Sequence, residues 1–470
     1  MKTTRVRSPS RNWRRIQDFI PLLLLALLVG IVGIAGGSVR ADALGAPVVR
    51  TTALLLASAA ILWGPVPAPR RIIGPLAMAM AFVLILLIQI LPIPGSWWFA
   101  LPGHGQYDAI AEILPELHGW RPISLVPDAT LNALFAMIVP LSTLLLLSMV
   151  STNRVTLVFH MLLGFAIVSA LIGSLQFSGG LMPNPFINDT PGEVGGLLAN
   201  RNHHALLLAA GIVLTAHWYI IGAARTISRL TIAALLASWL LLILLATGSR
   251  AGLALGLVAI VGAIVLAWRG IGPALSASPR WMRIGIAAGA VIIPIALLTA
   301  SFMQDRARSL DRAIELDAGS DMRLRALPTV LQMVRDFFPL GAGFGSFDTV
   351  FRSYEPAELL SIRYFNHAHN DFLELVFEGG IPALLLLIVS VAWYAHRSLR
   401  VWRKPPSQIV MAGRAASLVV FMIGIASIVD YPLRTPSMTV LLCVCGVALS
   451  LPCRRVAPSV GTLPDDTPAL

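Results

Sequence analysis

Stretches of about twenty apolar residues recur along nearly the whole sequence, and they constrain the fold more than any other feature. The hydrocarbon core of a bilayer is about 30 Å thick, and a helix needs roughly 20 residues to cross it. Of the 470 residues, 57% are hydrophobic and only 12% are charged. Soluble domains carry about 25% charged residues. The sequence therefore predicts an all-α protein that crosses a membrane many times.

We expect about twelve transmembrane helices, each close to the length that spans a bilayer. The first follows a basic start without a small-residue cleavage pattern, so we interpret it as an uncleaved helix. The expected spans are 19–37, 46–63, 72–91, 131–150, 155–176, 203–221, 230–246, 251–268, 284–301, 380–395, 409–429 and 438–451.

The distribution of Lys and Arg predicts the orientation, because cytoplasmic loops carry an excess of both. With the N-terminus inside, the basic loops also fall inside and the long polar segment 302–378 falls outside. The predicted organisation is 1–301 (basic start and nine helices), 302–378 (periplasmic loop), 379–453 (three helices) and 454–470 (cytoplasmic tail). Topology and anionic lipid account for the net charge of +12, so we expect no nucleic acid partner.

Three external segments separate the helices: 92–128, 177–201 and 302–378. The first is rich in Trp and Pro, which favours an aromatic belt at the membrane interface and leaves a carbohydrate-stacking surface as the alternative. The third contains 322–337, where apolar residues recur at helical spacing. It predicts a helical subdomain over the membrane part.

Ionisable residues at the hydrocarbon boundary are costly, which makes them functional candidates. The first cluster lies where a span begins, and it reads Asn200, Arg201, Asn202, His203 and His204. One interpretation is an anion-binding mouth at a helix N-terminus capped by Asn. The other is ordinary capping with a snorkelling Arg.

The second cluster is the short turn 247–252 between two apolar spans. Its Arg250 offers a planar fork of donors for a phosphate. The alternative is an interfacial Arg that bonds backbone carbonyls, and we favour the functional interpretation.

The third cluster lies in the long segment, with Arg323 and Arg325, then the glycine-rich stretch 338–347, then 367–371. No βαβ unit surrounds the glycines, so they indicate a tight turn and no dinucleotide site. A helix that starts near Asn370 places three acidic residues on one face and His369 at its mouth. Those acidic residues are Asp371, Glu374 and Glu378.

His369 is a candidate general base, because a histidine pKa lies near working pH. His367 and His369 also resemble half of a metal site, but no second pair of ligands follows, so we predict none. We interpret Asp430 and Arg434 as a structural ion pair outside the membrane.

Four motifs in this order resemble the O-antigen ligase and polymerase superfamily. A polar entrance motif comes first, then a Ser-Arg-Ala-Gly turn, a Pro-Leu-x-Gly-type loop and a His-Asn run that leads into the next span. They are Asn200-Arg201-Asn202, Ser249-Arg250-Ala251-Gly252, Pro339-Leu340-Gly341-Ala342-Gly343, and His369-Asn370-Asp371-Phe372-Leu373 with Glu378-Gly379-Gly380-Ile381-Pro382. An aromatic residue usually follows the loop arginine in this family, whereas Leu327-Pro328 stands here, so Arg325 remains an alternative to Arg323.

The resemblance implies a bacterial inner-membrane enzyme, similar in fold to GT-C-type glycosyltransferases, that moves a glycan from undecaprenyl diphosphate to an acceptor on the periplasmic face. It implies inverting, metal-independent transfer with no cofactor. His369, Arg250 and Arg323 are the expected catalytic residues. The expected substrate-binding residues are Arg201, Asn202, His203, Arg325 and Asn370.

The acceptor stays open among lipid A core, a growing polysaccharide and a protein. Membrane lipids are the other expected partner. A transporter of lipid or sugar with twelve spans is the alternative from another class, but transporters place charges near mid-membrane in repeated halves, and this sequence has no repeat.

Overall fold

The computed structural model describes residues 11–40, 43–180, 182–188, 190, 192–222, 226–276, 279–281, 284–285, 288, 299, 318–360 and 365–451. Helices make up most of this described part. Its strands, β1 (Pro92–Ile93) and β2 (Arg121–Pro122), form one short antiparallel pair. The predicted all-α, polytopic class is confirmed.

Ten helices in the described residues are long and apolar enough to cross a membrane. Each expected span except 284–301 coincides with a helix, and 284–301 lies almost wholly outside the described residues. The apolar helices are α1 (Arg11–Ala35), α2 (Gly45–Trp63), α3 (Ile73–Ile90), α6 (Pro127–Ala136) followed by α7 (Ile138–Met149), α8 (Val155–Phe177), α9 (Arg201–Ile220), α10 (Ile227–Ala246), α11 (Arg250–Ser276), α15 (Asp371–Arg403), α16 (Gln408–Val429) and the shorter α17 (Pro436–Ser450).

Helix α9 forms the centre of the bundle, with 94% of its spanning window buried inside the protein. It packs against α8, α10, α11 and α16. Small residues such as Gly211 permit this close packing, since a Cβ there would lie 3.1 Å from Leu240 and 3.0 Å from Ala166. Its N-terminus is thereby held among the ends of neighbouring helices.

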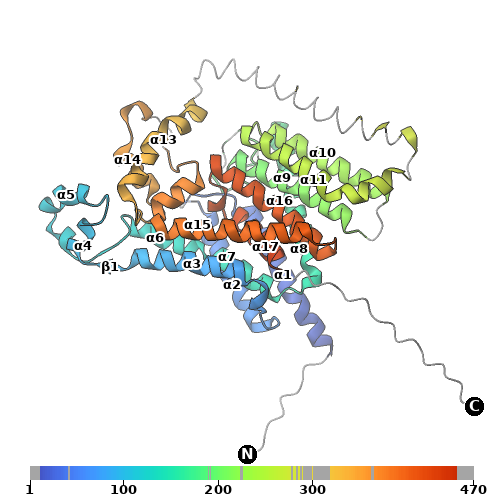
Figure 1. Ribbon diagram of the computed structural model, residues 1–470, viewed down its shortest axis with the longest axis horizontal. Coiled ribbons are helices and arrows are strands. Elements are labelled where there is room, and N and C mark those ends of the chain that lie inside the picture. The colour runs from blue at the N-terminus through green and yellow to red at the C-terminus, as the bar shows by residue number, and fades with distance from the viewer. Residues whose placement is uncertain are drawn as a thin grey trace, which may run out of the picture.

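A second, smaller apolar core lies in the segment that precedes α15. Helix α13 (Ala318–Phe337) and helix α14 (Phe347–Tyr354) pack there beside the start of α15 (Figure 1). Met333, Phe337, Phe347, Phe351 and Phe377 are fully buried in it. The expected helical subdomain is therefore present in the described part of that segment.

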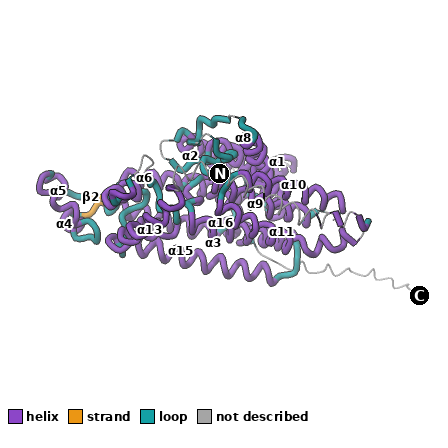
Figure 2. The backbone as a smooth tube through the Cα atoms, turned by 90° about the horizontal axis from the view of Figure 1, so that it is seen from above, coloured by secondary structure: helices purple, strands orange, loops and turns teal. Residues whose placement is uncertain are grey.

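The segment between β1 and β2 holds two short helices, α4 (Gly95–Phe99) and α5 (Asp108–Ile113). In both views it lies at the opposite end of the molecule from α10 and α11 (Figures 1 and 2). His104 of this segment lies 6.2 Å from Phe337 of α13, between ring centroids. The segment thus docks on the subdomain and is not an isolated loop.

Helix α15 is broken at Gly380, which has φ 57° and ψ −146°. Pro382 has no amide hydrogen to donate to the carbonyl of residue 378, and its ring displaces that carbonyl from the helix. That carbonyl instead accepts hydrogen bonds from Gln89 Nε2 at 2.8 Å and from the amide of Gly343 at 2.9 Å. The break therefore fixes the first part of α15 against α3 and the glycine-rich loop.

Candidate functional site

Asp430, directly after α16, is the hub of a buried polar cluster. Its side chain is 2% exposed. Asn200 Nδ2 donates to it at 3.2 Å, and the side-chain amide of Asn202 donates to the same carboxylate oxygen. The other oxygen lies 3.8 Å from His203 Nε2 and 3.5 Å from His369 Nδ1. The carboxylate thus joins the start of α9 to His369, two residues before α15.

His369 is held in a specific conformation at the mouth of α15. It is a residue other than glycine with a positive φ, 50°, a left-handed geometry that side chains rarely adopt. The next residue, Asn370, caps α15 by accepting from two amides, those of residues 372 and 373. The imidazole packs against Phe365 and Tyr431, at 5.2 Å and 4.9 Å between ring centroids. The predicted helix start and the position of His369 are confirmed.

The electrostatics of this contact keep Asp430 ionised and His369 neutral. Burial lowers the pKa of His369 below its usual value, and the Asp430 carboxylate raises it only in part. Burial would raise the pKa of Asp430, but contact with His369, His203 and Arg323 holds it well below the usual range. A neutral imidazole beside an ionised carboxylate can accept a proton.

The three acidic residues predicted on one face of α15 meet a single guanidinium. Arg434 Nη2 lies 3.0 Å from Glu374 and 2.8 Å from Glu378, and Nε lies 3.8 Å from Asp371. Burial opposes the charge on Arg434, but these carboxylates raise its pKa. The prediction that Asp430 and Arg434 form an ion pair is wrong. Asp430 lies beside His203 and His369, and Arg434 pairs with the carboxylates of α15, because helix periodicity turns all three of them toward it.

Glu374 also clamps the backbone that leads into His369. One oxygen lies 2.7 Å from His367 Nδ1, and the other accepts from the amide of Ala368 at 2.8 Å. The side chain is fully buried. Glu374 and Asn370 therefore restrain the chain on both sides of His369.

The glycine-rich stretch forms the predicted tight turn. Gly341 has φ +81°, and a Cβ there would lie 2.5 Å from the carbonyl oxygen of Glu378. Farther along, the amide of Gly345 donates to Glu378 Oε1 at 2.8 Å. The turn packs backbone against backbone, and it supports the Glu378 carboxylate of α15.

The start of α11 is linked to the same cluster. Ser249 Oγ donates to Asn202 Oδ1 at 2.7 Å and accepts from the amide of Gly252 at 2.8 Å, which caps α11. Arg250, the next residue, is exposed. Arg201 lies 3.9 Å from Glu193, and its guanidinium lies within 4.0 Å of the Cβ position of Gly248 in the same turn. Two arginines thus flank the turn that Ser249 fixes.

Arg323 and Arg325 point to different parts of the structure because residues two apart lie on opposite sides of a helix. Arg323 Nη1 donates at 2.8 Å to the carbonyl of Val429, the residue before Asp430. Arg325 Nη2 donates at 2.7 Å to the carbonyl of Glu358. Geometry therefore places Arg323 beside the polar cluster and Arg325 away from it.

Of the candidate residues, the structure gathers Asn202, His203, His369 and Arg323 around Asp430. Asn370, next to His369, caps α15. Arg201 and Arg250 lie at the linked turn, and Arg325 lies apart. Asp430 and Tyr431 were missed as site residues. An acidic residue at the end of an apolar span is the feature of the sequence that could have indicated Asp430. Its partner Asn202 lies 228 residues earlier, and no local pattern indicates so remote a contact.

In the residues that the structure describes, no group of three His, Cys, Asp or Glu side chains could hold a metal ion. The arrangement offers a neutral imidazole, a carboxylate behind it and arginines nearby. It also brings together the N-termini of α9, α11 and α15, whose free amides favour an anion.

The fold and this site define a multi-pass membrane protein with a polar, histidine-containing centre at one end of its helices. Residues 232–388, about a third of the chain, match the family model described as O-antigen ligase, which supports the resemblance to the O-antigen ligase and polymerase superfamily. The motif resemblance is thereby confirmed. The matched range includes Arg250, Arg323 and His369. No curated protein matches the chain. The family gives a general function, ligase- or polymerase-type glycosyl transfer with lipid-linked glycans in polysaccharide biosynthesis.

Proposed function

We propose that this protein transfers a glycan from undecaprenyl diphosphate to a hydroxyl group of an acceptor glycan, on the periplasmic face of the bacterial inner membrane. The observation that carries the proposal is one chain of contacts: Ser249 to Asn202, Asn202 to Asp430, and Asp430 to His369. It joins the starts of α11, α9 and α15 around a neutral imidazole. Ligation to lipid A core and extension of a polymer are two forms of this reaction, and a protein hydroxyl is the alternative acceptor.

His369 is the proposed general base. The acceptor hydroxyl attacks the anomeric carbon as His369 takes its proton, and the bond from that carbon to the diphosphate oxygen breaks with its electron pair on the leaving group. Asp430 then stabilises the imidazolium, at 3.5 Å from Nδ1. Attack opposite to the leaving group inverts the anomeric centre and requires no metal ion.

The leaving diphosphate gathers negative charge, which fixed cations and helix N-termini stabilise. Arg250 and Arg201 flank the turn at the start of α11, and Arg323 donates to the carbonyl of Val429, next to Asp430. We assign Arg250 and Arg323 to catalysis, and Arg201, Asn202, His203 and Asn370 to substrate binding. Arg325, bonded to Glu358, is the weakest assignment.

The proposed organisation follows the predicted one. Residues 1–301 and 379–453 form the membrane part, 302–378 is the periplasmic loop and 454–470 is a cytoplasmic tail. The excess of Lys and Arg at the ends of the helices remote from His369 supports this orientation.

The test uses a deletion strain complemented with wild type, His369→Ala, Arg250→Ala, Arg323→Ala or Arg325→Ala. Membrane level, surface glycan and lipid-linked donor are measured by immunoblot, gel and mass spectrometry. We expect the first three variants to insert normally, lose glycan and accumulate the undecaprenyl-linked donor. Arg325→Ala separates the two loop arginines, because it removes the same side chain from the other side of α13, where Arg325 bonds to Glu358.

Wild-type glycan in the His369, Arg250 and Arg323 variants would refute the site. The transporter alternative would be favoured if these variants lower the amount of lipid-linked donor in the periplasm while the purified variants transfer glycan as wild type does.

A further inference from the structure

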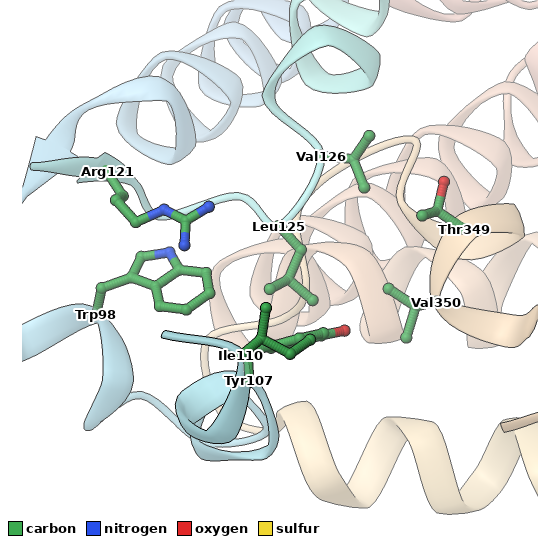
Figure 3. A pocket seen from close by; sticks show the side chains of 8 residues that line it. All are labelled: Trp98, Tyr107, Ile110, Arg121, Leu125, Val126, Thr349 and Val350. Carbon is green, nitrogen blue, oxygen red and sulfur yellow. The ribbon is translucent and has the colours of Figure 1, made fainter. Parts of the chain in front are cut away.

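A cavity of about 200 Å³ lies between the β1–β2 segment, the residues that lead into α6, and α14 (Figure 3). It belongs to none of the motifs discussed above. Its walls combine an indole, a guanidinium, two hydroxyl-bearing side chains and aliphatic groups. The lining residues are Trp98, Tyr107, Ile110, Arg121, Leu125, Val126, Thr349 and Val350.

Arg121 is held in a defined position at this cavity. Its guanidinium carbon lies 4.4 Å from the ring centroid of Trp98, within the range of a cation–π interaction. Trp98 is itself fixed, because its Nε1 donates at 2.9 Å to the carbonyl of Pro122. None of the eight lining residues is acidic, so the walls supply no counter-charge for Arg121.

The neighbouring histidine does not share the positive charge. Burial, and then Arg121, lower the pKa of His104 to about 4. His104 therefore stays neutral against the Trp98 ring, at 4.3 Å between centroids. Arg121 is the cation that faces a ligand in this cavity.

The tryptophans of this segment separate into two kinds. Trp97 is 67% exposed and Trp120 is 72% exposed, as expected of residues that anchor a protein at a membrane interface. Trp98 is only 3% exposed and lines the cavity. The aromatic belt thus explains the first two, and the carbohydrate alternative fits the cavity.

The cavity is joined to the candidate site through its floor and one wall. The amide of Leu125 donates at 3.0 Å to the carbonyl of Ala342, within the turn that supports Glu378. On the other wall, Val350 packs in the same apolar core as Phe365, whose ring contacts His369. The cavity and the candidate site are thus supported by the same glycine-rich turn and the same apolar core.

We propose that this cavity binds one carboxylate-bearing sugar residue of the glycan substrate, a proposal that rests on the function proposed above. Arg121 supplies a fork of donors that matches a carboxylate. Tyr107 and Thr349 supply hydroxyl groups, and the aliphatic side chains face the C–H groups of the ring. Pockets for larger ligands measure about 300–1,000 Å³, so this one takes a single ring.

The test is a saturation-transfer NMR titration of the full-length protein in phosphatidylcholine nanodiscs. The probes are tetragalacturonate and the neutral maltotetraose. We expect wild type to bind tetragalacturonate at least about tenfold more tightly than maltotetraose, a difference of about 1.4 kcal/mol. Arg121→Gln should lose that preference. Arg352→Gln, which removes the same charge from the exposed face of α14, should bind as wild type does, and thermal unfolding checks that both variants fold.

Four outcomes overturn the proposal: no binding by wild type, equal binding of both probes, unchanged binding by Arg121→Gln, or binding abolished in discs that contain phosphatidylglycerol. The last would assign the cavity to a lipid headgroup. His369→Ala separates this proposal from the proposed function, because it should abolish transfer and leave tetragalacturonate binding intact. If the wild-type protein binds tetragalacturonate through Arg121 but shows no transferase activity, the cavity is still a site for an acidic glycan. Only the proposed transferase function would then be refuted.

Discussion

Asp430 has the strongest electrostatic effect on the candidate site at the scale of single residues. An isolated buried carboxylate would protonate, because burial disfavours its charged form. Here two asparagine amides donate to it and two imidazoles lie within 4 Å. These contacts keep it ionised and orient His369. The function proposed for His369 therefore depends on a residue that does not touch the reacting atoms.

Asp430→Asn should lower transfer by about 100-fold, the low end of what positioned acid–base groups contribute. The shape is kept and the charge that stabilises the imidazolium is lost. The pH profile should also shift. Because the carboxylate raises the pKa of His369, its removal lowers that pKa further and moves the acidic limb of activity to lower pH.

The measurement is transfer by purified protein between pH 4 and pH 8, with His369→Ala as the control that has no such limb. An acidic limb that stays in place or moves to higher pH in Asp430→Asn would exclude His369 as the group that titrates.

Loss of Arg434 should destabilise the protein. Glu374 and Glu378 are fully buried and Arg434 lies at 3.0 Å and 2.8 Å from them. Arg434→Met leaves these carboxylates without their cation, which costs about 3–5 kcal/mol in comparable buried pairs. Thermal unfolding in detergent measures the change.

Arg352→Met is the matched control, since Arg352 pairs with Asp348 at 2.8 Å on an exposed surface and such pairs contribute about 0–1 kcal/mol. Equal stability of the Arg434 and Arg352 variants would show that the buried cluster is not held by Arg434.

At the scale of elements, the broken helix α15 and the glycine-rich turn form one unit. Pro382 frees the carbonyl of Glu378, and the turn supplies Gly343 as a donor to it. The helix break thus provides an acceptor for the turn, and the turn holds the Glu378 carboxylate, which meets Arg434. Each element would lack partners without the other.

Gly341→Ala should lower the stability of this unit by more than the free energy that a positive φ costs an alanine, because the added Cβ also clashes with α15. A left-handed backbone costs an alanine about 1–2 kcal/mol. At Gly341 the added Cβ also lies 2.5 Å from the Glu378 carbonyl oxygen. Gly179→Ala isolates the strain, because Gly179 has φ +88° with no atom within 4 Å of the Cβ position.

Thermal unfolding of both variants separates the two contributions. A loss for Gly341→Ala no larger than that for Gly179→Ala would mean that the turn moves away from α15 without cost, contrary to the packing described.

The sequence predicts elements well where a local period or cap decides them. Hydropathy locates the apolar helices, Asn370 marks the start of α15, and the i, i+3, i+7 spacing places its three carboxylates on one face. It fails where the partner is remote. Local spacing predicts a pair between Arg434 and its near neighbour Asp430. The observed partner, Glu378, lies 56 residues earlier in α15, and tertiary packing alone brings the two together.

At the scale of the whole molecule, the buried helix α9 sets the position of the site. Its polar N-terminus lies among the ends of α11, α15 and α16, and the subdomain of α13 and α14 lies beside the start of α15 (Figure 1). The opposite ends of the helices carry basic residues, including Arg400 and Arg403 in the last turn of α15 and Lys404 directly after it. One end of the bundle is thus basic and the other holds the candidate site.

This asymmetry predicts the orientation, because Lys and Arg in short loops stay in the cytoplasm. In a variant whose three native cysteines are replaced by Ala, a single cysteine is placed at Ser178, after α8 near the site end, or at Pro405, after α15 at the basic end. Both positions are exposed. An impermeant maleimide added to intact spheroplasts should label Ser178→Cys and spare Pro405→Cys, and lysis should expose both. The reverse pattern would place His369 and Asp430 in the cytoplasm, where a periplasmic transfer reaction cannot occur.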